Sequence, residues 1–269
     1  MTIAEKKKYL LEKKNYGVDD LVILIEVLRS KEGCPWDMEQ THKSIRRDFI
    51  EETYEVIEAI DNDDPVLLRE ELGDVLLQVA FHSQIEAEKN CFNLDDVAND
   101  VCVKLIHRHP HVFGDVVAET ADKVLSNWEA IKSAEKERKT FTDKLTAIPP
   151  MLPALMRADK VGRKASCFDF PNADSVMLKV KEELGEVEEA MLQNNAENIE
   201  EELGDLIFSV VSLCRKLHVE SEVALNKATD KFIKRFAMLE EAVVAEGKDI
   251  ASLEMSELDA IWDRIKGKA

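Results

Sequence analysis

The sequence has few cysteines and no long apolar run. The five cysteines are an odd number, and they form no C-x-x-C pair, which is typical of reduced thiols in the cytoplasm. No stretch approaches the ~18 apolar residues that a membrane span needs. The chain begins with Met1-Thr2-Ile3-Ala4-Glu5-Lys6 and shows no apolar signal segment there. We therefore expect a cytoplasmic protein that does not enter a membrane.

Positive charge is also scarce. The chain has 36 basic and 55 acidic side chains, which give a formal net charge of −19. This balance argues against nonspecific binding to nucleic acid or to an anionic membrane surface. A small anionic substrate is still compatible with it, provided that a metal ion and a few Lys or Arg side chains act locally. A glycine-rich phosphate loop of the G-x-x-x-x-G-K type is missing, which argues against a P-loop enzyme.

The second half of the chain contains two acidic pairs with helical spacing. Glu183 and Glu186 are three residues apart and share one face of a helix, and Glu202 and Asp205 do the same. Asn194-Asn195 between them is a turn signal. If the two helices form an antiparallel hairpin, four carboxylates converge. Such a group is strongly repulsive without a cation, and Mg²⁺ is the leading candidate.

The same arrangement occurs 131 residues earlier. The matched pairs are Glu52 with Glu183, Glu55 with Glu186, Glu71 with Glu202, and Asp74 with Asp205. In both copies the acids border the apolar stripe of the helix, whereas a purely solubilising face would lie across the helix from the core. The alternative is a duplicated domain whose acidic faces only keep it in solution. The repetition favours two cation sites.

The chain, at 269 residues and 45% apolar, is long enough for two domains with cores of their own. Residues 1–20 are weakly periodic and predict a loosely held lead-in. We expect an all-α fold with a first module over 21–135, a linker over 136–153 and a second module over 154–269. Thr41 or Ser44 is expected to cap the first acidic helix, and Asp174 or Ser175 the corresponding second one. Trp36, in a loop after Cys34-Pro35, is placed either to stack on a base or to cover the core.

Basic and aromatic residues follow each acidic hairpin. Lys104 and Arg108 have the same spacing as Lys231 and Arg235, and Trp128 corresponds to Trp262. These residues could bind phosphates and stack on a base, although each one alone is more often a surface or packing residue. The histidines at 107, 109 and 111 suggest a transition-metal site as an alternative, but Pro110 breaks the helix and separates their faces.

At these residues the chain resembles the MazG family of all-α nucleoside triphosphate pyrophosphohydrolases, over about residues 20 to 269. The resemblance includes both acidic hairpins, and its other motifs are Gly33-Cys34-Pro35-Trp36-Asp37 with Gln40-Thr41-His42, Arg108-His109-Pro110-His111-Val112-Phe113-Gly114, Leu152-Pro153-Ala154-Leu155 and Lys231-Phe232-x-x-Arg235-Phe236. It implies two tandem helical-bundle modules, a homodimer, Mg²⁺ with Mn²⁺ as a substitute, and hydrolysis of a broad range of nucleoside triphosphates, ATP included, to monophosphate and diphosphate.

The resemblance also implies roles for individual residues. The metal ligands of the second module would be Glu183, Glu186, Glu202 and Asp205, and those of the first Glu52, Glu55, Glu71 and Asp74. Nucleotide contacts would come from Lys179, Glu201, Asp205, Lys231, Lys234, Arg235 and Trp262. One departure is that Asp48 stands in the first module where the second has Lys179. An acid there disfavours phosphate, so we expect the second module to be the main catalyst.

The expected chemistry is direct attack of water on the α-phosphorus. A carboxylate, Glu182 or Glu183 with Glu186 nearby, would orient or deprotonate the water. The rival interpretations are a narrower dCTP-, dUTP- or phosphoribosyl-ATP-type pyrophosphatase and a non-catalytic helical interaction module. A di-iron carboxylate bundle is disfavoured because it requires a Glu-x-x-His pair, and the positions three after Glu183 and Glu202 are Glu186 and Asp205.

Overall fold

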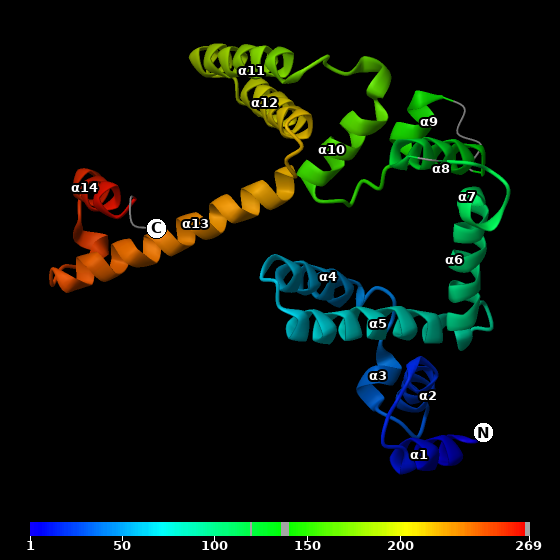
Figure 1. Cartoon of the computed structure of the whole chain (residues 1–269). Coiled ribbons are helices and arrows are strands. Elements are labelled where there is room, and N and C mark those ends of the chain that lie inside the picture. The colour runs from blue at the N-terminus through cyan, green and yellow to red at the C-terminus, as the bar shows by residue number, and fades with distance from the viewer. Residues whose placement is uncertain (119, 136–139, 267–269) are drawn as a thin grey trace. The chain divides into compact units, whose positions relative to one another are not determined.

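The computed structural model describes residues 1–118, 120–135 and 140–266, and every regular element in those ranges is a helix (Figure 1). The all-α prediction is confirmed. The chain divides into two compact units, Met1–Lys132 and Ser133–Ala269. Residues 136–139 of the expected linker, residue 119 and the last residues 267–269 lie outside the described part. Among the described helices, none combines the length and apolar character needed to cross a bilayer.

The described residues form seven helices within the first unit and an eighth that crosses its boundary. They are α1 (Ile3–Glu12), α2 (Val18–Leu28), α3 (Pro35–Glu39), α4 (Arg46–Asp61), α5 (Pro65–Ala87), α6 (Leu94–Arg108), α7 (Pro110–Phe113) and α8 (Ala121–Glu135). The helices of the second unit are α9 (Phe141–Thr146), α10 (Ala154–Lys164), α11 (Ala173–Gln193), α12 (Ala196–Lys216), α13 (Ser221–Ala245) and α14 (Met255–Ile265), with short 3₁₀ turns η1 (Ser166–Phe168) and η2 (Ile250–Ser252).

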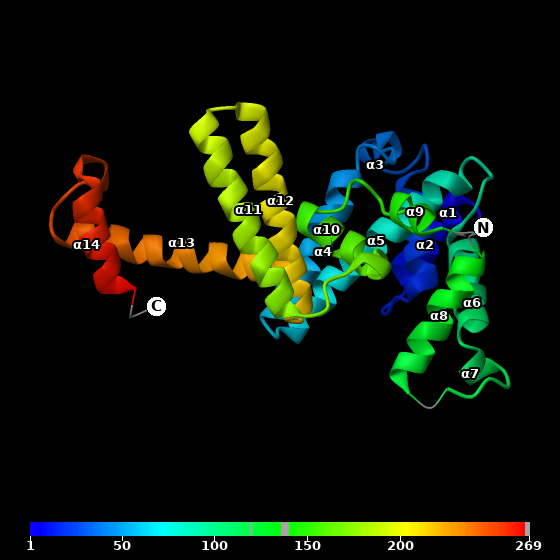
Figure 2. The ribbon, with the colours of Figure 1, turned by 90° about the horizontal axis from the view of Figure 1, so that it is seen from above.

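Each unit is built around one helical hairpin, α4 with α5 and α11 with α12 (Figures 1 and 2). The turn between α4 and α5 ends at Asp64, whose side chain accepts from the backbone N–H groups of Val66 and Leu67, and Pro65 occupies the first helical position. Asn194 ends α11 in the left-handed conformation with φ 52°, which asparagine tolerates. Asn195 then caps α12.

Two predicted helix caps were wrong. The side chain of Asn172, two residues before Asp174, caps α11 by accepting from the backbone N–H of Ser175 at 2.9 Å. Helix α4 begins at Arg46 without a side-chain cap, because Thr41 and Ser44 hydrogen-bond to each other's backbone in the preceding turn.

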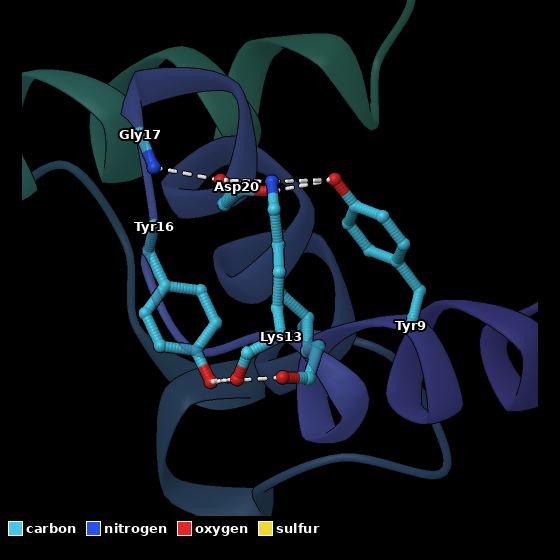
Figure 3. Close-up of polar contacts among 6 residues, drawn as sticks. Tyr9, Lys13, Tyr16, Gly17 and Asp20 are labelled. Carbon is cyan, nitrogen blue, oxygen red and sulfur yellow. Dashed lines mark hydrogen bonds and ion pairs between the residues drawn. The ribbon is translucent and has the colours of Figure 1, made fainter.

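The expectation of a loosely held start was also wrong. Helix α1 is capped by Thr2 and Glu5, and polar contacts to Asp20 hold it against α2 (Figure 3). The Asp20 carboxylate is 4% exposed and accepts from Lys13 Nζ at 2.6 Å, the Tyr9 hydroxyl at 2.8 Å and the Gly17 backbone at 2.6 Å. These donors, Lys13 first, lower the pKa of Asp20 to about 2. Apolar periodicity could not reveal a helix that is held by polar contacts.

The two units have separate hydrophobic clusters. In the first unit Ile25 of α2, Ile45 before α4 and Phe81 of α5 pack together with Ala80 and Ile85. In the second unit Leu239 and Val243 of α13 pack against Ile261 and Ile265 of α14. The first cluster lies beside the α4/α5 hairpin and fixes its position against α2.

Candidate functional site

The structure brings three acidic side chains together in the α11/α12 hairpin. Glu183 and Glu186 of α11 and Glu202 of α12 each offer a carboxylate oxygen, and these oxygens all lie within 4.8 Å of one another. We call these residues the second acidic group. The i, i+3 spacing on α11 places two of the acids on one face, and the turn at Asn194 brings α12 back beside that face.

The α4/α5 hairpin repeats the arrangement. Glu52 and Glu55 of α4 and Glu71 of α5 also place one oxygen each within 4.8 Å of the others. We call these residues the first acidic group. The fourth predicted ligand of each set, Asp74 and Asp205, lies outside these groups of three. Asp205 is exposed on α12, whereas Asp74 lies close enough to Glu52 to affect its titration.

No basic side chain of the described residues forms an ion pair with the first acidic group. Burial, followed by the charges of Asp74 and Glu55, raises the pKa of Glu52. Burial, followed by the charge of Glu55, raises the pKa of Glu71. Like charges in a partly desolvated place favour the protonated carboxyl unless a cation is bound. The chemistry of this donor set therefore fits a hard divalent cation.

A lysine partly neutralises the second acidic group. Lys179, one turn before Glu183 on α11, places its Nζ 2.8 Å from Glu183 Oε1 and 2.9 Å from Glu182 Oε1. Both contacts, that with Glu183 first, raise the pKa of Lys179. The close contact with the Glu183 carboxyl, followed by burial, raises the pKa of Glu186.

Glu183 provides the strongest indication of a cation site. The residue is 5% exposed, and among the described residues its Oε2 is buried with no hydrogen-bond partner. Buried polar atoms are almost always paired, so an unpaired carboxylate oxygen needs an explanation. A cation between Glu183, Glu186 and Glu202 would supply the partner.

The other predicted site residues lie in two places. Glu182 and Glu201 are exposed on α11 and α12, each next to a member of the second acidic group. Lys231, Lys234, Arg235 and Trp262 lie on α13 and α14. There Trp262 packs on Phe232 with ring centroids 5.3 Å apart, and Arg235 Nη2 donates to the Lys266 carbonyl at 3.4 Å. Within the described residues, no hydrogen bond or ion pair connects these four side chains to the acidic group.

The histidines near Pro110 do not assemble a metal site among the described residues. His109 and His111 have ring centroids 5.6 Å apart, and His109 Nδ1 lies 2.6 Å from the Leu105 carbonyl oxygen. The groups of three or more metal-binding side chains found in the described part are the two acidic groups. The transition-metal alternative has no support in this geometry.

Gln78 is a pocket residue that the sequence did not predict. This buried residue of α5 lines a small pocket together with Trp36 and Asp48. Its position four residues after Asp74 could have identified it, because the two side chains share a helix face.

Comparison with known proteins places both hairpins in one family. The sequence model described as the MazG nucleotide pyrophosphohydrolase domain matches residues 40–113 and 172–238. Each matched range contains one acidic group. The two ranges together cover half of the chain.

Similar proteins extend over nearly the whole chain. A Thermotoga maritima protein named nucleoside triphosphate pyrophosphohydrolase/pyrophosphatase MazG is 44% identical over 251 residues, which cover 93% of this chain and 95% of that protein. An Escherichia coli K12 protein named nucleoside triphosphate pyrophosphohydrolase is 41% identical over 254 residues, which cover 93% and 97%. The Bacillus subtilis protein YabN is 41% identical over 246 residues, which cover 90% of this chain and 50% of YabN.

Proposed function

Since the chain belongs to the MazG nucleotide pyrophosphohydrolase family, we propose that its α11/α12 hairpin converts nucleoside triphosphates to nucleoside monophosphates and diphosphate. The chain is a hydrolase of nucleoside triphosphates. The observation that supports this hairpin as the main catalytic site is the buried Oε2 of Glu183 in the second acidic group, which has no hydrogen-bond partner in the described part of the chain. We expect this site to accept a broad range of ribo- and deoxyribonucleotides, ATP included.

The cation that fits the second acidic group is Mg²⁺, with Mn²⁺ as a substitute. Glu183, Glu186 and Glu202 would hold the ion, and Asp205 would be the fourth protein ligand, since hard cations prefer carboxylate oxygens. When bound, the ion supplies positive charge at the α- and β-phosphates and on the leaving diphosphate.

The side chains around the acidic group have separate tasks. Lys179 holds a positive charge beside Glu183, from which it can contact a phosphate oxygen of the substrate. Glu182 or Glu183 orients the attacking water and accepts its proton. Glu186 helps to hold the cation beside them. The P–O bond between the α-phosphorus and the bridging oxygen breaks, and the water oxygen stays on the monophosphate.

We also propose that the chain functions as a homodimer. Apolar side chains on α13 are exposed in the single chain, among them Leu225 at 54%, Phe232 at 56% and Ile233 at 59%. A second copy that covers this face would bury them. It would also offer Lys231, Lys234, Arg235 and Trp262 as phosphate and base contacts for a nucleotide held at the acidic group of its partner.

The first acidic group would hold a cation as well, through Glu52, Glu55 and Glu71 with Asp74 beside them. It lacks the neighbouring positive charge, because position 48 is Asp where the second hairpin has Lys179. We therefore assign it the weaker turnover.

The products of a nucleotide panel test this proposal. The full chain is incubated with Mg²⁺ and each of the common ribo- and deoxyribonucleoside triphosphates in H₂¹⁸O, and diphosphate is scored separately from phosphate. We expect diphosphate as the first product and ¹⁸O in the monophosphate. Inorganic phosphate as the first product, or ¹⁸O in the diphosphate, would exclude attack at the α-phosphorus.

A further inference from the structure

Two histidines of the first unit meet edge to edge. His42 lies in the turn before α4, His82 lies on α5, and their Nδ1 atoms are 2.7 Å apart. The two rings are nearly parallel, at 8°, with centroids 5.0 Å apart. The centroid distance exceeds the N–N distance by about two ring radii, so both nitrogens lie on the line between the centroids. This is the geometry of an in-plane N–H···N hydrogen bond, which needs one hydrogen between the rings.

The other nitrogen of His42 determines which ring donates. His42 Nε2 lies 2.6 Å from Glu86 Oε1. The Glu86 carboxyl is ionised, because Lys89 and then His42 lower its pKa to about 2. A carboxylate only accepts hydrogen bonds, so His42 Nε2 carries a hydrogen and donates it. In neutral His42 the Nδ1 atom is then an acceptor, and His82 Nδ1 is the donor.

This histidine pair can hold one added proton but not two. A first proton makes His42 an imidazolium, which donates to Glu86 from Nε2 and to His82 from Nδ1. A second proton puts a hydrogen on both facing Nδ1 atoms. The hydrogen bond between the rings is then lost, and two positive charges repel each other at close range. Burial, followed by the charge of His42, lowers the pKa of His82, which agrees with this repulsion.

The surroundings of the pair offer little compensation for a second charge. Glu86 already accepts from Lys89 Nζ at 2.7 Å, and the thiol of Cys91 also lies beside its carboxylate. From α4 the uncharged ring of Phe49 packs on His82, with centroids 5.9 Å apart. Within the described residues no carboxylate forms a hydrogen bond or an ion pair with His82. A positive charge on His82 therefore lacks a counter-ion there.

The pair connects the turn before α4 to α5. Helix α4 begins at Arg46 without a side-chain cap, so its first turn depends on how the preceding residues are held. Ile45, just before α4, is 4% exposed and packs in the same hydrophobic cluster as Phe81, the neighbour of His82 on α5. The contact between His42 and His82 thus fixes the chain where it enters the α4/α5 hairpin.

We propose that His42 and His82 form a pH-sensitive switch, which holds the turn before α4 on α5 while the pair carries at most one added proton and releases it when both rings are charged. The folded state resists the second proton, so the contribution of the pair to stability is complete above the ordinary histidine pKa of about 6.5. It is lost as the pH falls below that value. The inference does not depend on the proposed function.

The switch is specific to the first unit. The residues 131 positions after His42, His82 and Glu86 are Ala173, Leu213 and Leu217, which do not titrate. The start of α11 is held instead by the side chain of Asn172, which accepts from the backbone N–H of Ser175. Mild acid should therefore loosen the entry to α4 and leave the entry to α11 unchanged.

Hydrogen exchange of the full chain tests this difference. Exchange of the backbone amides over residues 42–50 is measured by mass spectrometry between about pH 8 and pH 5, and the rates are corrected with the same peptides of the unfolded chain. We expect the protection of this segment to fall by about fivefold or more as the pH is lowered. Residues 173–181 at the start of α11 are the internal control and should change by less than about twofold.

Two variants of His82 separate the switch from other effects of acid. The amide of His82→Asn does not titrate near neutral pH, and it can donate to neutral His42 or accept from charged His42. Its protection should therefore stay within about twofold over the whole range. His82→Leu removes the hydrogen bond at every pH, so the segment should already be poorly protected at pH 8. Melting temperatures at pH 8 check that both variants fold.

A further variant and a second measurement complete the test. His218→Asn changes an exposed histidine with a φ of 56°, which asparagine tolerates, and it should respond to acid as the unmodified chain does. The pKa of His82 is measured by NMR of the ¹⁵N-histidine-labelled chain. It should rise toward the ordinary value in His42→Gln, because the neighbouring charge is removed.

Three results would overturn the inference. The protection of residues 42–50 is independent of pH in the unmodified chain, or His82→Asn loses that protection in acid to the same extent, or the titration of His82 is unchanged in His42→Gln. Each of them leaves the proposed hydrolysis untouched, because that is decided by diphosphate release.

Discussion

Lys179 Nζ lies 2.8 Å from Glu183 Oε1, so a positively charged side chain lies beside the second acidic group. The corresponding residue of the first hairpin is Asp48. One sequence difference thus gives two similar acidic groups different electrostatics. The carboxylates of the first group repel one another, whereas in the second Lys179 balances part of the negative charge.

Replacing Lys179 tests this difference. In Lys179→Met the buried Glu183 loses its partner, so the melting temperature without metal should fall by a few degrees. The rise in melting temperature on adding Mg²⁺ should be larger than in the unmodified chain. The ratio kcat/KM for ATP should fall about tenfold or more, because a phosphate contact is lost. Differential scanning fluorimetry and a diphosphate assay measure both effects, with the exposed neighbour Lys181→Met as the control. Unchanged kinetics in Lys179→Met would separate this lysine from the substrate.

The folded chain should be more stable when the first acidic group loses one of its charges. Burial and like charges raise the pKa of Glu52 and Glu71, so their ionised forms oppose folding as the pH rises above the normal carboxyl range. In the absence of metal, Glu52→Gln should therefore raise the melting temperature at pH 8 and have little effect near pH 4. It should also reduce the stabilisation by Mg²⁺. Thermal denaturation with EDTA and with Mg²⁺ at both pH values tests this prediction, and a lower melting temperature at pH 8 would contradict it.

Acid should weaken the contact between α1 and α2. The pKa of Asp20 is lowered to about 2, so its stabilising contribution is present above the normal aspartate pKa of about 3.9 and is lost as the pH falls toward 2. Asp20→Asn should lower the melting temperature clearly at pH 7. The difference in melting temperature between this variant and the unmodified chain should become smaller between about pH 4 and pH 2. The exposed neighbour Asp19→Asn is the matched control. A difference that stays constant over this range would mean that the charge of Asp20 is unimportant.

The dimer prediction depends on the exposed face of α13. Ile233 is 59% exposed, so Ile233→Asp costs the single chain little but places a charge in the proposed interface. The variant should have the mass of one chain in light scattering at micromolar concentration, and its hydrolysis should fall together with the dimer fraction. Asp230→Asn on the same helix serves as the control. A monomeric unmodified chain with full activity would refute the dimer.

The helical hairpins were predictable from the sequence because their signals are local. Pro65 and the Asn194-Asn195 turn mark where helices start and stop, and the i, i+3 acids fix which side chains share a face. Helix α1 was not predictable from apolar periodicity, because contacts of Tyr9 and Lys13 with the buried Asp20 hold it against α2. The small pocket lined by Trp36, Asp48 and Gln78 was also not predictable from a local pattern, because its walls come from separate helices. Lys231 is far from the acidic residues in the sequence. Whether it lies near them therefore depends on tertiary and quaternary contacts, which a local pattern does not predict.

The central claim is that the acids of the α11/α12 hairpin hold the cation for hydrolysis. The most direct test is the rate of diphosphate release from ATP at saturating Mg²⁺ by the full chain, compared between Glu186→Ala and the matched first-hairpin variant Glu55→Ala. We predict that Glu186→Ala lowers kcat by about 100-fold or more, whereas Glu55→Ala lowers it by less than about threefold. Full activity in Glu186→Ala would contradict the account.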